Sequence, residues 1–309
     1  MYKVAFIFPG QGAQYIGMAQ DFYNEVPESK EVFDSATKAL GFDMTSLCFE
    51  ENEDLNKTEY TQAAMLTACI SILRAVEKEG IKADITAGLS LGEYSALVAN
   101  RVFSFEDAVK IVRKRGKYMV NEVASGVGTM AAILGMETDK IETICKQVAS
   151  ESGKPVELAN YNCPGQIVIS GEKEAVLLAC EKLKEAGAKR TIELNVSGPF
   201  HSSMLKGAGE KLAKELENIN LQPMDIPYVN NVSAELVLGN QLIKEYLEKQ
   251  VYSPVKWQQS IECMIENGVE TFIEIGPGRT LSGFLKKIDR TKKVINIEKY
   301  IDLEKLKDI

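Results

Sequence analysis

Residues 88–92 of the chain read Gly-Leu-Ser-Leu-Gly, a serine enclosed by two glycines. The pattern follows an apolar run that predicts a strand and precedes a run that predicts a helix. On such a cramped turn the serine hydroxyl is exposed, and side chains larger than glycine would not fit beside it. We therefore expect Ser90 to be a nucleophile and the backbone N–H of Leu91, at the helix start, to stabilise an oxyanion. A plain helix N-cap is the alternative that these five residues leave open.

A serine nucleophile needs a base, and the sequence contains a single histidine, His201. Histidine is the side chain whose ordinary pKa lies nearest to neutrality. Gly198 and Pro199 predict a turn that presents the ring from a loop or a helix start. A lone histidine is more often a core or surface residue without function, but together with Ser90 it favours a Ser–His pair.

A second glycine-containing turn, Pro9-Gly-Gln-Gly12, closes the first predicted strand. It matches neither of the common phosphate-binding patterns, G-x-G-x-x-G and G-K-[ST], so a nucleotide-binding interpretation is weak. The turn lies at the carboxyl end of its strand, where open α/β sheets bind their ligands, and Ser90 lies at another such end. The backbone N–H of Gln11 is therefore a candidate for the second oxyanion donor.

The elements that must position these residues are strands alternating with helices. Such alternation implies a mostly parallel sheet covered on both faces. In the helix at 58–79, Thr58 is the predicted N-cap and Gly80 the predicted stop. The predicted strands are 3–8, 84–88, 226–230, 271–274 and a final strand near the carboxyl end. The predicted helices are 28–40, 58–79, 93–100, 105–123, 202–216, two around Trp257 and one before the final strand.

The middle of the chain has a different order of elements. Its predicted strands are 128–134, 156–161, 166–170 and 189–194, and its predicted helices are 138–152 and 173–186. This β-α-β-β-α-β order is that of the ferredoxin-like split unit. We expect residues 126–196 to form a small inserted subdomain, with residues 1–125 and 197–309 forming the catalytic core.

Composition excludes several classes of function. The 309 residues carry 36 Lys and Arg against 44 Asp and Glu, and a net charge of −8 is unsuited to sequence-independent nucleic-acid binding. One histidine cannot build a Cys2His2 or HExxH zinc site, so we expect no metal. The six cysteines form no C-x-x-C pair, which favours reduced thiols. Since neither a signal peptide nor a span of ~20 apolar residues is visible, we expect a soluble, cytoplasmic protein without a membrane partner.

Taken together, these motifs resemble those of the malonyl-CoA:acyl carrier protein transacylase family, and the resemblance runs nearly from end to end. The family fold is an α/β-hydrolase-like core with a ferredoxin-like insertion, in agreement with the predicted elements. The matching motifs are Phe8-Pro-Gly-Gln-Gly12, Thr61-Gln62, Gly88-Leu-Ser-Leu-Gly-Glu-Tyr94, Arg115-Gly-Lys-Tyr-Met119, Asn160-Tyr-Asn-Cys-Pro-Gly-Gln166, Gly198-Pro-Phe-His-Ser202, Asn230-Asn-Val-Ser-Ala234, Gln250-Val-Tyr-Ser-Pro254 and Glu274-Ile-Gly-Pro-Gly278.

The resemblance implies a role for each candidate residue. Ser90 would be the acylated nucleophile, and His201 the general base and acid. The N–H groups of Gln11 and Leu91 would form the oxyanion hole. Gln250 lies in the segment whose backbone carbonyl orients the histidine in this family, so that no triad aspartate is required.

The resemblance also makes Arg115 the residue that binds the free carboxylate of a malonyl group. A planar guanidinium suits this task because it donates two parallel charge-assisted bonds to a carboxylate. From the sequence around it alone, Arg115 would instead be solvated surface charge. One departure from the family pattern is Leu89, where many members have histidine. Another is Ala63, where Thr-Gln-Pro-Ala is usual.

The implied activity is ping-pong transfer of malonyl from malonyl-CoA to the phosphopantetheine thiol of acyl carrier protein, for fatty acid or polyketide synthesis. Neither a metal nor a redox cofactor is expected, and we expect a monomer. Two alternatives are a serine hydrolase and a non-catalytic carrier-binding subunit. An acidic carrier protein would need a basic patch on this chain. The candidate residues are Lys286, Lys287, Arg290, Lys292 and Lys293. A merely solvated surface is an equally good interpretation of these charges.

Overall fold

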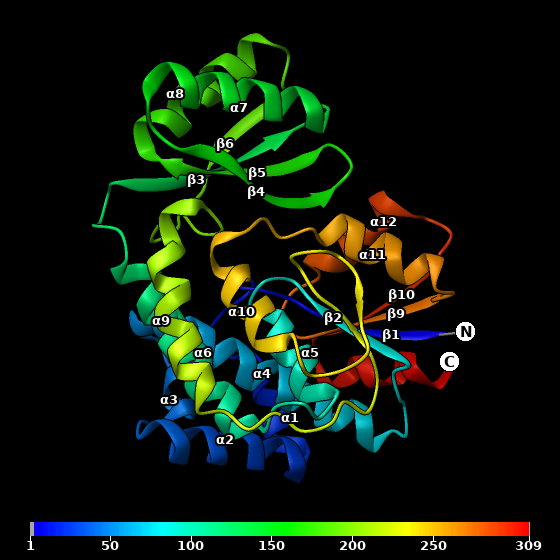
Figure 1. Ribbon diagram of the computed structural model, residues 1–309. Coiled ribbons are helices and arrows are strands. Elements are labelled where there is room, and N and C mark those ends of the chain that lie inside the picture. Colours follow the sequence, from blue (N-terminus) through cyan, green and yellow to red (C-terminus); the bar gives the residue numbers. More distant parts are fainter. Residues whose placement is uncertain (1–2, 309) are drawn as a thin grey trace.

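The computed structural model describes residues 3–308 and contains two sheets (Figure 1). Sheet A has the strand order β10-β9-β1-β2-β7-β8, and all of its neighbours are parallel except β7 and β8. The predicted α/β class with a mostly parallel sheet is confirmed. The strands of sheet A are β1 (Val4–Phe8), β2 (Ile85–Gly88), β7 (Tyr228–Val229), β8 (Leu236–Val237), β9 (Thr271–Ile275) and β10 (Lys293–Ile297).

Helices cover sheet A on both faces, as predicted. They are α1 (Gln20–Glu25), α2 (Pro27–Leu40), α3 (Met44–Phe49), α4 (Thr58–Lys78), α5 (Gly92–Ala99), α6 (Phe105–Asn121), α9 (Lys206–Glu217), α10 (Ile243–Tyr252), α11 (Trp257–Glu266) and α12 (Thr280–Ile288). Three short 3₁₀ segments, η1 (Asp54–Asn56), η2 (Ser203–Leu205) and η3 (Tyr300–Asp308), complete this part of the chain.

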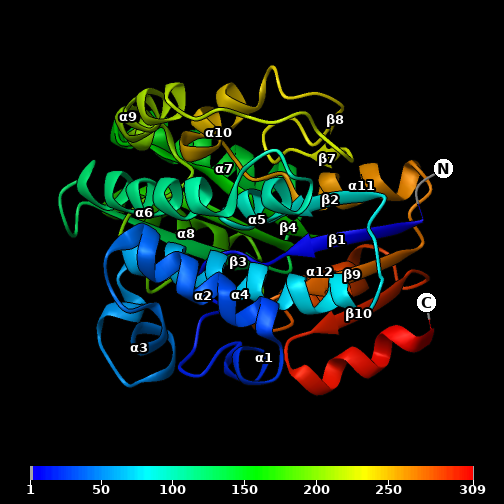
Figure 2. The ribbon, with the colours of Figure 1, turned by 90° about the horizontal axis from the view of Figure 1, so that it is seen from below.

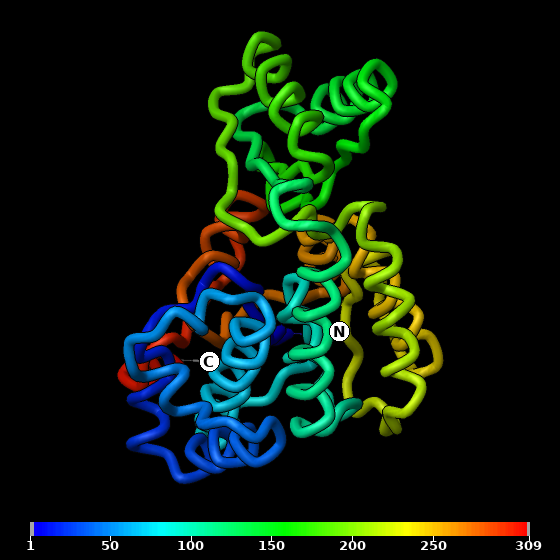
Figure 3. The backbone as a smooth tube through the Cα atoms, turned by 90° about the vertical axis from the view of Figure 1, so that its left-hand side faces the viewer, coloured from blue at the N-terminus to red at the C-terminus, as the bar shows by residue number. Residues whose placement is uncertain are grey.

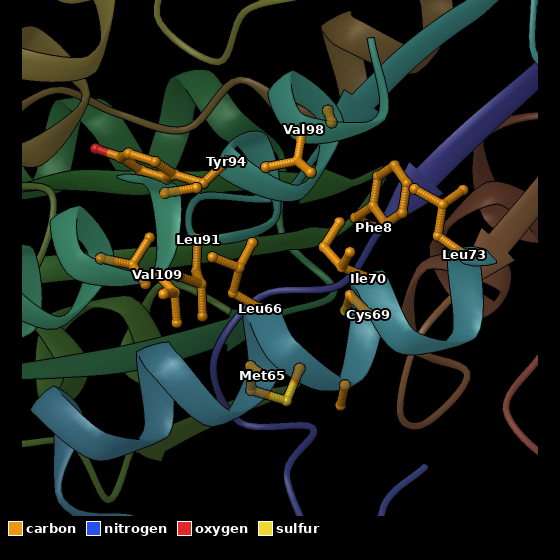
Figure 4. Packing of buried hydrophobic residues seen from close by; sticks show 14 of the residues in the cluster. Phe8, Met65, Leu66, Cys69, Ile70, Leu73, Leu91, Tyr94, Val98 and Val109 are labelled. Atoms are coloured by element: carbon orange, nitrogen blue, oxygen red, sulfur yellow. The ribbon is translucent and has the colours of Figure 1, made fainter. Parts of the chain in front are cut away.

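Alternate residues of the central strand β1 enter two separate hydrophobic cores, because successive side chains of a strand point to opposite faces. Phe6 and Phe8 pack into the core that contains α4, where Figure 4 shows Phe8 beside Ile70 and Leu73. Ala5 and Ile7 enter the other core, built with side chains of α11 and α12. On the first face α2 and α4 lie side by side (Figure 2). Because β1 is buried on both of its faces, its residues Val4–Phe8 form a continuous apolar run.

Sheet B belongs to a smaller unit that projects from the rest of the chain and packs against it (Figure 3). Its antiparallel strands have the order β4-β5-β3-β6, and α7 and α8 pack on one face. The predicted β-α-β-β-α-β order is confirmed. Its elements are β3 (Gly128–Leu134), α7 (Thr138–Ser152), β4 (Val156–Cys163), β5 (Gln166–Glu172), α8 (Lys173–Glu185) and β6 (Arg190–Glu193).

The structure differs from the sequence-based expectations at several element ends. The N-cap of α4 is Lys57, and Thr58 is the first residue of the helix, so the predicted cap was wrong. The predicted helix at 202–216 begins with the 3₁₀ turn η2, and α9 starts only at Lys206. Gly80 does follow the end of α4, with φ of 80°. The six-residue helices α1 and α3 were not predicted, because so few residues show little periodicity.

All six cysteines are free thiols in the structure, as the sequence predicted. Within residues 3–308, none of the helices combines the length and the apolar character that crossing a membrane requires.

Candidate active site

The turn that carries Ser90 is closed by backbone contacts at both of its glycines. A Cβ added to Gly88 would lie 1.9 Å from the carbonyl carbon of Gly92, and one added to Gly92 would lie 2.1 Å from the oxygen of Phe8. Ser90 itself has φ of 52°, a strained conformation for a residue with a side chain. Neither glycine position has room for a Cβ, so both glycines are required, and Ser90 follows the end of β2 in a strained turn.

Ser90 and His201 meet although 111 residues separate them in the chain. Ser90 Oγ lies 2.7 Å from His201 Nε2, and His201 Nδ1 lies 2.7 Å from the backbone oxygen of Gln250. A carbonyl can only accept, so Nδ1 donates its proton to Gln250 and Nε2 carries the lone pair that faces the hydroxyl. The ring is thereby oriented to remove a proton from Ser90.

The charge state of His201 suits a base. The side chain is 4% exposed, and burial followed by the nearby Arg115 cation lowers the pKa of the imidazole to about 3. Both effects penalise the charged ring, while the hydrogen bond to Gln250 acts in the opposite direction. His201 is consequently neutral at physiological pH, and its Nε2 lone pair can face the Ser90 hydroxyl.

Arg115 is buried beside the serine and is only 1% exposed. The solvated-charge interpretation of this residue was wrong, because α6 packs closely against α4 and turns the side chain inward. A Cβ on the adjacent Gly116 would lie 2.8 Å from the Cα of Glu59 in α4, which shows how close the two helices are. Arg115 Nη2 lies 3.1 Å from Ser90 Oγ.

The other partners of Arg115 are neutral. Nη2 donates to Gln250 Oε1 and Nη1 to Gln62 Oε1, each at 3.0 Å, and the guanidinium lies 5.7 Å from the ring centroid of Tyr94. None of these groups cancels the positive charge. The arrangement leaves a buried cation next to Ser90, and this cation can pair with an anionic group of a ligand.

Behind Ser90 lies a set of polar side chains whose role the sequence did not indicate. Asn231 Oδ1 accepts from the N–H of Ser90 at 2.7 Å, and Asn231 Nδ2 donates to the oxygen of Gly88 at 2.8 Å. Gln250 Nε2 donates to the oxygen of Ser90 at 2.9 Å and to Glu93 Oε2 at 2.6 Å. Asn231 and Glu93 both belong to motifs that resemble those of the family. The residues around them in the sequence do not show that their side chains support the turn at Ser90.

A cleft of about 1010 Å³ opens over Ser90, and it is lined by residues that follow β1 and β2 at their carboxyl ends and by residues of sheet B. Gln11 and Leu91, the expected oxyanion donors, line this cleft together with Ser90, His201 and Arg115. In the described part of the chain, the N–H groups of Gln11 and Leu91 donate to no protein acceptor. All the site residues expected from the sequence thus converge, with Gln250 immediately behind them.

The residues of the expected basic patch are divided by the structure. Thr280 and Phe284 of α12 line the cleft, and on the same helix Lys287 Nζ reaches Gln166 Oε1 of sheet B at 3.3 Å. Lys286 and Lys293 instead line a separate hollow of about 510 Å³ between α12, β10 and η3. Lys287 is therefore a member of the patch that contacts sheet B.

Comparison with known proteins places this geometry in a family. The family described as acyl transferase domain matches residues 5–301. The malonyl CoA-acyl carrier protein transacylase of Bacillus subtilis (strain 168) is 50% identical over 298 residues, which are 96% of this chain and 94% of that one. That of Staphylococcus aureus (strain MSSA476) is 48% identical over 305 residues, 98% of each chain.

Solved structures agree with these relatives. The malonyl CoA-acyl carrier protein transacylase from Clostridium perfringens superposes with a TM-score of 0.95 at 49% identity, over 99% of this chain and 96% of that one. A malonyl-transacylase solved in complex with its type II PKS acyl-carrier protein gives 0.96 at 41% identity, over 99% of this chain and 100% of that one. The chain belongs to the malonyl-CoA:acyl carrier protein transacylase family of acyl transferases.

Proposed function

We propose that this chain transfers the malonyl group of malonyl-CoA to the phosphopantetheine thiol of an acyl carrier protein, through a malonyl ester on Ser90. The names of the relatives support the substrate and the partner. The observation that carries the proposal for this chain is the position of Ser90 Oγ, 2.7 Å from His201 Nε2 and 3.1 Å from Arg115 Nη2. A base and a cation at one hydroxyl suit transfer of a carboxylated acyl group.

In the first half-reaction, His201 Nε2 removes the hydroxyl proton while Ser90 Oγ attacks the thioester carbon. The N–H groups of Gln11 and Leu91 stabilise the oxyanion that forms. The carbon–sulfur bond then breaks, and the CoA sulfur takes the proton from His201. Gln250 holds the ring in the required tautomer throughout, through its backbone oxygen.

In the second half-reaction, the thiol of the carrier protein gives its proton to His201 and its sulfur attacks the malonyl ester. The same two N–H groups stabilise the second oxyanion. The carbon–oxygen bond then breaks and Ser90 Oγ recovers the proton, which restores the enzyme. Since the same base and the same donors serve both halves, a single site is sufficient for ping-pong transfer.

We further propose that residues 1–125 and 197–309 form the catalytic core and that residues 126–196 form the subdomain that covers the cleft. The strands of sheet B all lie within residues 126–196. The reaction as written needs neither a metal nor another cofactor, and the protein would act as a cytoplasmic monomer.

Intact mass spectrometry after mixing the protein with malonyl-CoA, acetyl-CoA or methylmalonyl-CoA tests the proposal. A single malonyl adduct, transferred to holo carrier protein upon its addition, is the expected result. Release of free malonate without transfer to the carrier would identify a hydrolase. Absence of any acyl adduct would point to a non-catalytic carrier-binding subunit.

A further inference from the structure

Glu93 is a buried carboxyl group that the reaction as proposed does not use. It lies in the first turn of α5, and 0% of its surface is exposed. Ser90 and Arg115 line the cleft, whereas Glu93 lies behind them. An acidic side chain is costly to bury unless other groups hydrogen-bond to it. The partners of Glu93 therefore indicate what the buried carboxyl does.

One oxygen of Glu93 joins the two residues that hold the backbone of Ser90. Glu93 Oε2 accepts from Gln250 Nε2 at 2.6 Å and from the N–H of Asn231 at 3.2 Å. Gln250 Nε2 also donates to the backbone oxygen of Ser90, and Asn231 Oδ1 accepts from the N–H of Ser90. Both backbone polar groups of Ser90, which has φ of 52°, are thus held by residues that share one acceptor.

The same carboxamide also holds Arg115. Gln250 Oε1 accepts from Arg115 Nη2 at 3.0 Å, while the amide nitrogen points to Glu93. If the amide were turned over, its oxygen would face Glu93 Oε2, another acceptor, and its NH2 group would face the donors of Arg115. Glu93 therefore favours the observed orientation from the side away from the cleft, and Arg115 favours it from the cleft.

We propose that Glu93 is a positioning residue, whose Oε2 holds the Gln250 carboxamide where it seats both Arg115 and the turn of Ser90. The inference rests on the proposed function, since it takes Arg115 to be the partner of the malonyl carboxylate. Glu93 acts through Gln250 and contacts none of the reacting atoms. Because a carboxyl keeps an acceptor oxygen even when it is protonated, this role depends on the reach of the side chain and not on its charge.

Two substitutions separate reach from charge. Glu93→Gln keeps the length of the side chain and an acceptor oxygen but carries no charge. Glu93→Asp keeps the charge and withdraws the carboxylate by one methylene group, out of hydrogen-bond range of Gln250 Nε2. Glu31→Asp, at an exposed glutamate of α2, is the matched control. The measurement is kcat/KM for acylation by malonyl-CoA and by acetyl-CoA, per mole of protein that can be acylated on Ser90.

In Glu93→Asp we expect the ratio of malonyl to acetyl kcat/KM to fall roughly tenfold, because a loosened carboxamide no longer holds the guanidinium in place for the malonyl carboxylate. In Glu93→Gln the ratio should stay within about twofold of wild type, as it should in Glu31→Asp. The ratio does not depend on the fraction of protein that is folded, so a loss of stability in Glu93→Asp leaves the test intact.

An equal loss with both donors in Glu93→Asp would overturn the proposal, because it would mean that Glu93 only supports the fold. A fall of the ratio in Glu93→Gln would overturn it as well, because it would assign the effect to the charge. If wild type forms no malonyl-Ser90 adduct, the proposed function fails. If the adduct forms and the ratio is the same in wild type and Glu93→Asp, only the positioning role of Glu93 fails.

Discussion

Arg115 and Glu93 lie on opposite sides of the Gln250 carboxamide, which accepts from Arg115 Nη2 at 3.0 Å and donates to Glu93 Oε2 at 2.6 Å. The buried cation is thus separated from the buried carboxyl by one neutral group. Direct pairing would leave the guanidinium with little attraction for a substrate. Burial lowers the pKa of Arg115, and the nearby Tyr94 and Glu93 act against this effect. The amide spacer thus leaves Glu93 close enough to favour the charged guanidinium while Arg115 stays available.

Replacing Ser90 tests whether this residue is the acylated nucleophile. Malonyl-CoA alone should add one malonyl mass to wild type, located on the peptide that contains Ser90. Ser90→Ala should abolish the adduct without unfolding the protein, since alanine is smaller and keeps the backbone in place. Peptide mapping by mass spectrometry makes the measurement, and an adduct that persists in Ser90→Ala would exclude this residue as the nucleophile.

Removal of the base should slow acylation. His201→Ala should lose at least the ~10²-fold typical of general-base catalysis. Because the pKa of His201 is lowered to about 3, the neutral ring persists as the pH falls, and the rate of wild-type acylation should stay nearly flat from pH 8 to pH 5. Rapid-quench measurement of malonyl-Ser90 across this range decides the point. A decline centred near pH 6.5 would show that the ring titrates as it does in water.

Selectivity should depend on Arg115. Arg115→Ala should lose malonyl transfer by about 3–5 kcal/mol, the usual cost of breaking a buried charge pair, while acetyl transfer holds or rises. Arg115→Lys should recover only part of the malonyl rate, because an ammonium cannot donate two parallel bonds. The measurement is the ratio of kcat/KM for malonyl-CoA to that for acetyl-CoA. A ratio that is the same in all three proteins would mean that Arg115 does not read the carboxylate.

Docking of the carrier protein should depend on the basic end of α12. Reversal of Lys286 and Lys287 to glutamate should weaken transfer to the carrier protein, most clearly at low salt, and should leave acylation by malonyl-CoA unchanged. Reversal of Lys30 and Lys38, two exposed lysines of α2, changes the net charge equally and serves as the control. If both double reversals change KM for the carrier protein equally, Lys286 and Lys287 do not form the docking site.

Glu93 should make the stability of the protein depend on pH in an unusual direction. Burial raises the pKa of its carboxyl from 4.5 to about 7, against the opposing hydrogen bond from Gln250. The native state therefore holds this proton more tightly than the unfolded chain, and the stabilising contribution is lost as the pH rises from about 4.5 to about 7. The loss is on the order of 3 kcal/mol for a difference of this size.

Glu93→Gln removes that titration and keeps an acceptor oxygen for Gln250. Between pH 5 and pH 8, the free energy of unfolding should fall more in wild type than in Glu93→Gln. Urea titrations at the two pH values give the difference, in which the titrations of other groups cancel. The same pH dependence in both proteins would show that Glu93 ionises as an ordinary carboxyl.

The sequence by itself determined the parts of this protein that depend on neighbours a few residues apart. The glycines around Ser90 are required by contacts within one turn, and long helices and strands are set by periodicity over a dozen residues. A single histidine left one choice of base. These features predicted a nucleophile, its base and the order of the elements without any knowledge of the packing.

Only the tertiary structure decided which polar groups are buried together. Arg115 lies in a charged stretch of α6, and its burial depends on contacts with Gln62 and Gln250, which are 53 and 135 residues away. The hydrogen bond between Asn231 and the N–H of Ser90 joins residues that are 141 positions apart. Such positions arise from the approach of distant elements, whose energies local propensity and periodicity do not contain.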